Sequence, residues 1–102
     1  MKRFWHVTPL YNTDSILENG FNGDYIWATD NYEDVFNWIR ILNSEKNIEE
    51  WAVIEIVAEH YIKEKSRKYP SQYQCMIKDL EIESLCESFE SMDEVKRAEE
   101  QF

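Results

Sequence analysis

The sequence has only two glycines, two prolines, two cysteines and two histidines among its 102 residues. It contains no glycine-rich phosphate loop, no nucleophile elbow and no H-E-x-x-H motif. Cys75 and Cys86 stand singly, without the paired spacing of a metal site, so we interpret them as reduced, partly buried thiols. A metal centre would need carboxylates with His6 or His60, and no spacing predicts one. We therefore expect no metal.

Long apolar runs and basic residues are also scarce. No run is long enough to span a bilayer, and no signal-type apolar core follows the first three residues, so we expect a cytoplasmic protein. Eleven basic residues stand against 21 acidic ones, a formal net charge of −10. Such a surface repels nucleic-acid backbone and membrane head groups, and we expect neither as a direct partner. It suits a solvated acidic face or, where the acids cluster, a basic protein partner.

Apolar and aromatic residues are plentiful, at 43% and 15% of the chain. That content indicates a folded domain and argues against a disordered acidic tail. The length suits one domain over residues 1–102, with a single modest core.

Hydrophobic alternation and capping residues predict the elements. In the first strand, residues 3–8, Phe4, His6 and Thr8 share one face because alternate side chains of a strand do so. Ser91 and Glu94 form a capping box that opens a terminal helix. This pattern predicts an α+β domain with strands gathered into one or two small sheets. We expect further strands at 24–29, 51–57, 72–77 and 80–85, a short helix capped at Asn12 or Thr13 and stopped at Gly20, helices at 31–43 and 91–102, and a basic loop or hairpin tip at 60–70.

Four stretches of the chain resemble blocks of ADP-ribosyltransferase-fold proteins. The first, FWHVTPLYNTDSILENGF at 4–21, is similar to the family's opening, where a strand with His-x-Thr runs into x-x-L-x-S-I-L-x-x-G. The others are GDYIWATDNYEDVFNW at 23–38, WAVIEIV at 51–57 and SQYQCMIKDLEIESL at 71–85. The resemblance implies a small split antiparallel sheet with two or three helices, a core at about 3–85 and a C-terminal helix at about 91–102.

The resemblance also implies a site. In the His-Tyr-Glu branch of the family, the histidine hydrogen-bonds a ribose of NAD, the tyrosine stacks on nicotinamide and the glutamate supports the oxocarbenium-like transition state. His6 matches the histidine, Thr8 the residue beside it in the pocket, and Tyr25 the stacking tyrosine. Phe36 or Trp38 would supply a second aromatic wall for the cofactor.

The glutamate is replaced. Gln72 stands at the matching position before a tyrosine, and its amide has no charge to stabilise a developing cation. One preorganised electrostatic group is often worth about 3 kcal/mol, so the loss would remove much of a transferase rate. Glu81 or Glu83 would serve if the hairpin register differs, and Glu55 is a weaker substitute. An exposed strand position is the plainer reading of Gln72.

Two functions follow as expectations. The first is a protein that binds NAD or an ADP-ribose-type nucleotide through His6, Thr8 and Tyr25, with residual or altered ADP-ribosyl transfer. The second is a non-catalytic acidic inhibitor or adaptor, for example a phage-encoded factor that binds a host protein; a nucleotide sponge would combine the two. His6 as a packed core histidine remains the plain alternative, and the basic run at 63–68 is either a solvated loop or a contact for pyrophosphate.

Overall fold

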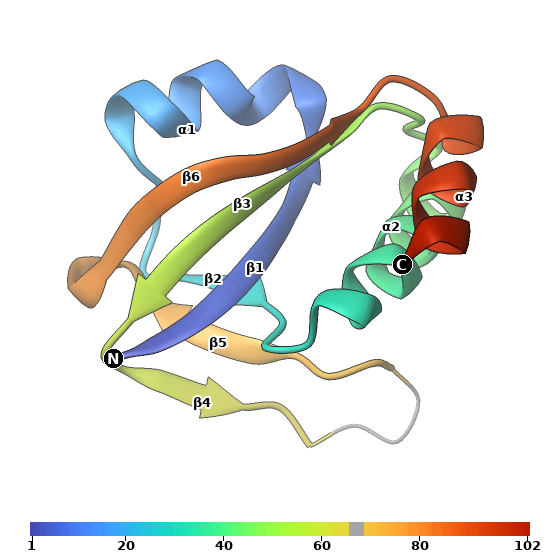
Figure 1. Ribbon diagram of the computed structural model, residues 1–102. Helices are drawn as coiled ribbons and strands as arrows, with labels where there is room; N and C mark the ends of the chain where they lie inside the picture. Colours follow the sequence, from blue (N-terminus) through green and yellow to red (C-terminus); the bar gives the residue numbers. More distant parts are fainter. Residues whose placement is uncertain (66–68) are drawn as a thin grey trace.

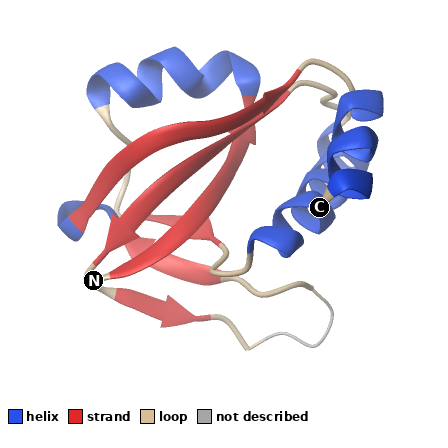
Figure 2. Ribbon diagram, in the orientation of Figure 1, coloured by secondary structure: helices blue, strands red, loops and turns tan. Residues whose placement is uncertain are grey.

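Three α-helices and two three-stranded antiparallel sheets make up the part of the chain that this computed structural model describes, residues 1–65 and 69–102 (Figures 1 and 2). The expected α+β class and split antiparallel sheet are confirmed.

The first sheet, which we call sheet A, has the order β1 (Lys2–Pro9), β3 (Trp51–Ala58), β6 (Leu80–Phe89). The central strand β3 is the predicted strand at 51–57, and six of its eight residues are buried. Apart from Glu55 the strand is an apolar run, because both of its faces are largely covered. The edge strand β6 continues to Phe89, beyond the predicted end at 85. Its register on β3 shifts twice, between Val53 and Ile54 and between Glu55 and Ile56.

The second sheet, sheet B, has the order β2 (Tyr25–Ala28), β5 (Tyr73–Met76), β4 (Tyr61–Lys63). The strand β4 lies in the segment predicted as a basic loop or hairpin tip. It forms because Tyr61 packs edge-on against Phe4, with ring centroids 5.0 Å apart, while its backbone pairs with β5. Arg67 and Lys68, which the prediction placed in the same basic run, lie outside the described residues.

A single backbone bridge joins the two sheets within the described residues. The Trp5 N–H donates to the Thr29 carbonyl at 2.8 Å, and the Thr29 N–H donates back at 2.9 Å. Beyond this pair β1 and β2 diverge, so the sheet is split between them (Figure 1).

The helices are α1 (Thr13–Asn19), α2 (Tyr32–Lys46) and α3 (Met92–Gln101). The predicted cap at Ser91 is confirmed, since its hydroxyl accepts from the Glu94 N–H. At the start of α2, where the sequence offers Asp30 or Asn31 as the cap, the Asn31 side chain accepts from the Glu33 N–H. Two 3₁₀ turns connect elements, η1 (Leu10–Asn12) before α1 and η2 (Ile77–Asp79) before β6. No helix in the described ranges has the length and apolarity that crossing a membrane requires.

Two hydrophobic clusters hold these layers together. One lies between sheet A and sheet B, where Phe4, Ile54 and Ile56 meet Ile26 and Cys75. The other lies on the opposite face of sheet A. There α2 and α3 pack together against the sheet, on the right in Figure 1. The helix α1 belongs to the first face, where its Ile16 packs against the cluster between the sheets. The second cluster consists of Val35, Phe36, Ile39, Trp51, Val53, Phe89 and Val95.

Candidate functional site

A surface cleft opens beside the end of β1, with a volume of about 260 Å³. Its walls come from β1, η1, α1 and the loop that leads to β2. Five of the eight lining residues have polar side chains, which favours a polar ligand. Small-molecule sites occupy roughly 300–1,000 Å³, so this cleft is at the small end of the range. It is large enough for one sugar ring and a group attached to it, but not for a whole dinucleotide. The lining residues are His6, Thr8, Asn12, Ser15, Ile16, Gly20, Phe21 and Asn22.

His6 is held in one tautomer. Its Nδ1 lies 2.6 Å from the main-chain oxygen of Trp27, and because a carbonyl only accepts, Nδ1 must carry the proton. In the neutral ring Nε2 is then an acceptor, and it has no hydrogen-bond partner in residues 1–65 and 69–102. The Phe21 ring packs edge-on against the imidazole at 5.0 Å. His6 therefore has one nitrogen committed to the fold and one available to a ligand.

The electrostatics keep this ring neutral. Burial lowers the pKa of His6 below its usual 6.5, although the hydrogen bond to the Trp27 carbonyl opposes the shift. The positive charge of Lys46, in the last turn of α2, also lowers the pKa. At neutral pH the cleft therefore presents a hydrogen-bond acceptor at Nε2 rather than a cation.

The His6 side chain also accounts for the split in the sheet. A regular ladder beyond the bridge of Trp5 and Thr29 would next pair Val7 with Trp27. The Trp27 carbonyl instead accepts from the His6 ring, and no main-chain bond joins Val7 to Trp27 in the described structure. Successive residues of β1 direct their N–H and C=O groups alternately toward β3 and away from it. The groups of Trp5 bond to Thr29, so those of Val7, two residues further on, also point away from β3. The N–H and C=O of Val7 therefore face the gap between the strands.

The chain after His6 forms the opposite wall of the cleft. Pro9 ends the strand, since it has no N–H to donate, and η1 turns the chain toward α1. Asn12 comes back over the strand, where its Nδ2 lies 3.5 Å from the Thr8 hydroxyl. Gly20 ends α1 with φ of +78°, a backbone conformation that side chains disfavour, and so lets the loop close the cleft.

A second and much smaller space, which we call the slot, lies at the split itself. Its volume is about 30 Å³, enough for a water or two. Gln72 and Trp38, two of the predicted site residues, meet here with Trp27. The Trp38 indole N–H donates to the Ser71 carbonyl at 3.0 Å, and its ring stacks on Tyr69 at 5.8 Å. The slot is therefore closed by a tryptophan that has its own polar and aromatic partners.

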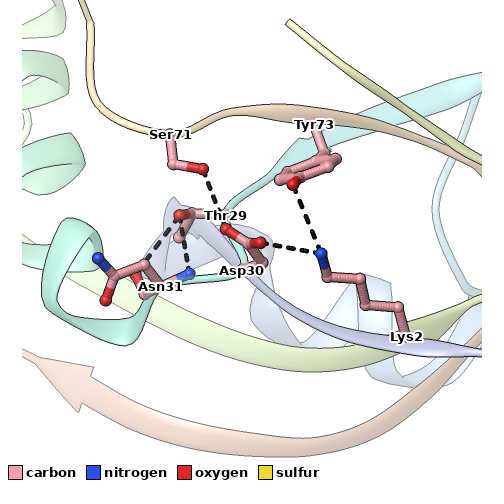
Figure 3. A network of polar contacts seen from close by, with 6 residues as sticks. All are labelled: Lys2, Thr29, Asp30, Asn31, Ser71 and Tyr73. Carbon is pink, nitrogen blue, oxygen red and sulfur yellow. Dashed lines mark hydrogen bonds and ion pairs between the residues drawn. The ribbon is translucent and has the colours of Figure 1, made fainter.

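A polar network holds the segment around Gln72 (Figure 3). The Ser71 hydroxyl donates to Asp30 at 3.0 Å, and the Lys2 ammonium lies 2.9 Å from the same carboxylate and 3.4 Å from the Tyr73 hydroxyl. In Figure 3 the Lys2, Asp30, Ser71 and Tyr73 side chains converge from the starts of β1, α2 and β5. Because both neighbours of Gln72 belong to this network, its backbone is fixed at the mouth of the split.

The structure separates the other predicted site residues from the cleft. Tyr25 lies on the outer face of sheet B, 43% exposed and edge-on to Trp27 at 5.5 Å, and does not line the cleft. Phe36 is 2% exposed inside the cluster between sheet A and its helices, so no ligand can reach it there. Phe36 therefore belongs to the hydrophobic core and does not line the cleft.

The alternative glutamates are not brought to the slot either. Glu81 and Glu83 lie on β6, which β3 separates from β1, so they are about two strand spacings or roughly 10 Å away. Glu55 shares the face of sheet A that carries Trp5, but it does not line the slot, and its carboxylate pairs with the Arg3 guanidinium at 2.9 Å. Gln72 thus remains without a nearby substitute carboxylate from these three residues.

No family model matches this chain, and neither a curated protein nor a solved structure matches it.

Proposed function

We propose that this protein binds a nucleotide of the NAD or ADP-ribose type, with a ribose in the cleft at His6, and that it does not turn the nucleotide over. The proposal rests above all on the His6 ring, whose Nδ1 donates to Trp27 and whose Nε2 is an acceptor at a polar cleft, with no partner among the described residues. A ribose hydroxyl is a suitable donor to that nitrogen, and the Thr8 and Asn12 side chains offer further polar contacts.

The slot supports ADP-ribose over NAD as the ligand. A cavity that accepts benzene measures about 150 Å³, whereas the slot measures about 30 Å³. Nicotinamide would enter only if Trp38 left the Ser71 carbonyl. The Val7 N–H and C=O would then complement a carboxamide, which is why NAD stays within the proposal as the weaker ligand.

We base the loss of turnover on Gln72. A neutral amide lacks the charge with which a carboxylate stabilises the cation that develops when the bond from ribose to nicotinamide breaks, a contribution often worth about 3 kcal/mol. Within the cytoplasm, where we place the protein as part of this proposal, such a binder would act as a nucleotide sponge.

Calorimetric titration with ADP-ribose and with NAD tests the proposal. We expect saturable binding of ADP-ribose, weaker binding of NAD, and loss of both in His6→Ala. The matched control is His60→Ala, which removes the other histidine, 66% exposed and outside the cleft. Circular dichroism checks that both variants fold. No heat with either ligand, or equal binding by His6→Ala, would make His6 a structural histidine and end the proposal.

A second candidate function, the acidic inhibitor that binds a basic protein, is favoured by β6. All six residues from 83 to 88 on this edge strand are exposed, and Glu81, Glu83 and Glu87 project from it. Charge-neutralising Glu→Gln changes at these three positions should weaken capture of a basic partner and its dependence on salt. The same variant should leave ADP-ribose binding unchanged, so the two functions are distinguishable.

A further inference from the structure

A group of three metal-ligating side chains lies away from the cleft, near the end where β3 turns into β4. Glu59 and His60 form that turn, and Asp79 is the last residue of η2, just before β6. One nitrogen or oxygen atom from each side chain lies within 4.8 Å of the other two. His60 Nδ1 is 2.8 Å from an Asp79 carboxylate oxygen.

The backbone holds these residues in place. The Glu59 N–H donates to the Asp79 carbonyl at 3.2 Å, which ties the turn directly to η2. The His60 carbonyl accepts from the Met76 N–H at 3.0 Å. On either side, Ala58 pairs with Leu80 in sheet A and Tyr61 pairs with Cys75 in sheet B. The three side chains therefore project from a main chain that is already ordered, which lowers the entropic cost of gathering them.

The donor set selects the kind of ion. One imidazole nitrogen and two carboxylates suit Zn²⁺ and neighbouring divalent transition metals, whereas Mg²⁺ and Ca²⁺ prefer oxygen alone. Donors at about 2.0–2.1 Å from one tetrahedral ion lie roughly 3.3 Å apart. Small rotations of the three side chains, of which Glu59 and His60 are exposed and Asp79 is half-buried, would close the present separations of up to 4.8 Å to that distance. Three protein ligands leave the fourth position of a tetrahedral ion to water.

The charge of the three side chains also favours a divalent cation. Two carboxylates and a neutral imidazole carry −2, which a divalent cation balances. The chain as a whole carries −10, so its field raises the local concentration of cations.

We propose that Glu59, His60 and Asp79 bind a divalent transition-metal ion of the Zn²⁺ class. The ion would join the turn between β3 and β4 to η2, at the place where the chain passes from one sheet to the other. This site does not depend on the nucleotide cleft, because no residue of the cleft belongs to it.

Zinc titration, followed by calorimetry and by thermal unfolding, tests the site. The experiment uses the full chain in two backgrounds, wild type and Cys86→Ser, because the exposed thiol of Cys86 is itself a possible zinc ligand. We expect one Zn²⁺ per chain in both backgrounds and a rise in Tm with zinc. Both responses should persist in excess Mg²⁺.

The variants His60→Ala and Asp79→Asn should each weaken zinc binding by at least about ten-fold and remove the rise in Tm. His6→Ala and Glu81→Gln are the matched controls, one histidine and one exposed carboxylate outside the group, and should bind zinc as the wild type does. Asp79→Asn keeps the side-chain shape, so a variant that folds by circular dichroism and still binds zinc normally would overturn the proposal. Binding that disappears with Cys86→Ser, or no binding by the wild type, would overturn it as well.

Discussion

The imidazole of His6 and the carbonyl of Trp27 are 2.6 Å apart, and this side-chain contact stands where a regular sheet would have a backbone bond between β1 and β2. The same contact sets the tautomer of the ring and opens the gap beside it. One hydrogen bond therefore links the split of the sheet to the chemistry of the cleft.

Replacing His6 separates these two roles. In His6→Asn the amide nitrogen can still donate to Trp27, because it occupies a position similar to Nδ1, but nothing replaces Nε2. We expect this variant to keep most of the wild-type stability and to lose ADP-ribose binding. Urea unfolding and calorimetry measure the two effects. If His6→Asn bound the nucleotide as well as the wild type, Nε2 would not be the contact.

The pH dependence of binding should follow the ring of His6. Burial lowers its pKa below 6.5, so the ring stays neutral and affinity stays level from pH 8 to about 6.5. As the pH falls further, protons bind the unfolded chain before the folded one. Stability contributed by the neutral ring is therefore lost below pH 6.5, and binding fails once the folded ring is protonated. An NMR titration of the His6 ring protons measures this pKa in the folded protein. A value above 6.5 would contradict the prediction.

The Lys2–Asp30 ion pair should make a modest, acid-sensitive contribution to stability. Burial alone would raise the pKa of Asp30, but hydrogen bonds from Lys2 and Ser71 outweigh it and hold the pKa below 3.8. The contribution is thus complete above pH 3.8 and is lost as the pH falls through the lower, folded pKa. Because both side chains are partly exposed, Lys2→Met should cost about 0.5–1 kcal/mol at pH 7.

Urea unfolding at pH 7 and at pH 2 measures this difference. Lys96→Met, an exposed lysine on α3, is the control and should change little at either pH. An equal loss for Lys2→Met at both pH values would show that the effect comes from lost contacts of the lysine stem and not from its charge.

The two cysteines should differ sharply in reactivity. Cys75 is fully buried between the sheets, and burial raises the pKa of its thiol to about 12. Cys86 is exposed on β6, although partial burial also raises its pKa. Iodoacetamide should therefore label only Cys86 in the native protein, slowly at pH 7, and both thiols in guanidinium. Peptide mass spectrometry identifies the sites, and native labelling of Cys75 would contradict the core described above.

Two isoleucines offer a matched test of that core. Ile54 is fully buried between the sheets, whereas Ile62 on β4 is 62% exposed. Removing one methylene from Ile54 as Ile54→Val should lower the free energy of unfolding by about 0.5–1.5 kcal/mol. Ile62→Val should change it by less than about 0.5 kcal/mol. Urea unfolding of both variants measures the contrast, and similar losses would mean that β4 is more deeply packed than its exposure indicates.

Local features of this protein were predictable from the sequence alone. The alternation of Phe4, His6 and Thr8 predicted their shared face, and the caps at Asn31 and Ser91 lie where the helix starts were expected. Each of these depends on residues two to four apart, whose geometry the period of the backbone determines. The α+β class followed from the order of such elements. His6 and Thr8 lie together in a cleft because they are neighbours on one strand face.

The tertiary structure alone decided which distant residues meet. Tyr25 points to the outer face of sheet B because β2 buries Ile26 and Ala28, while Phe36 faces the core because α2 lies on sheet A. The pairing of β4 with β5 and the approach of His60 to Asp79, 19 positions away, also depend on contacts across the fold. A local sequence pattern predicts which side of a strand or helix is apolar. Only the mutual placement of the two sheets determines what each side contacts, because side chains far apart in sequence are joined solely by that placement.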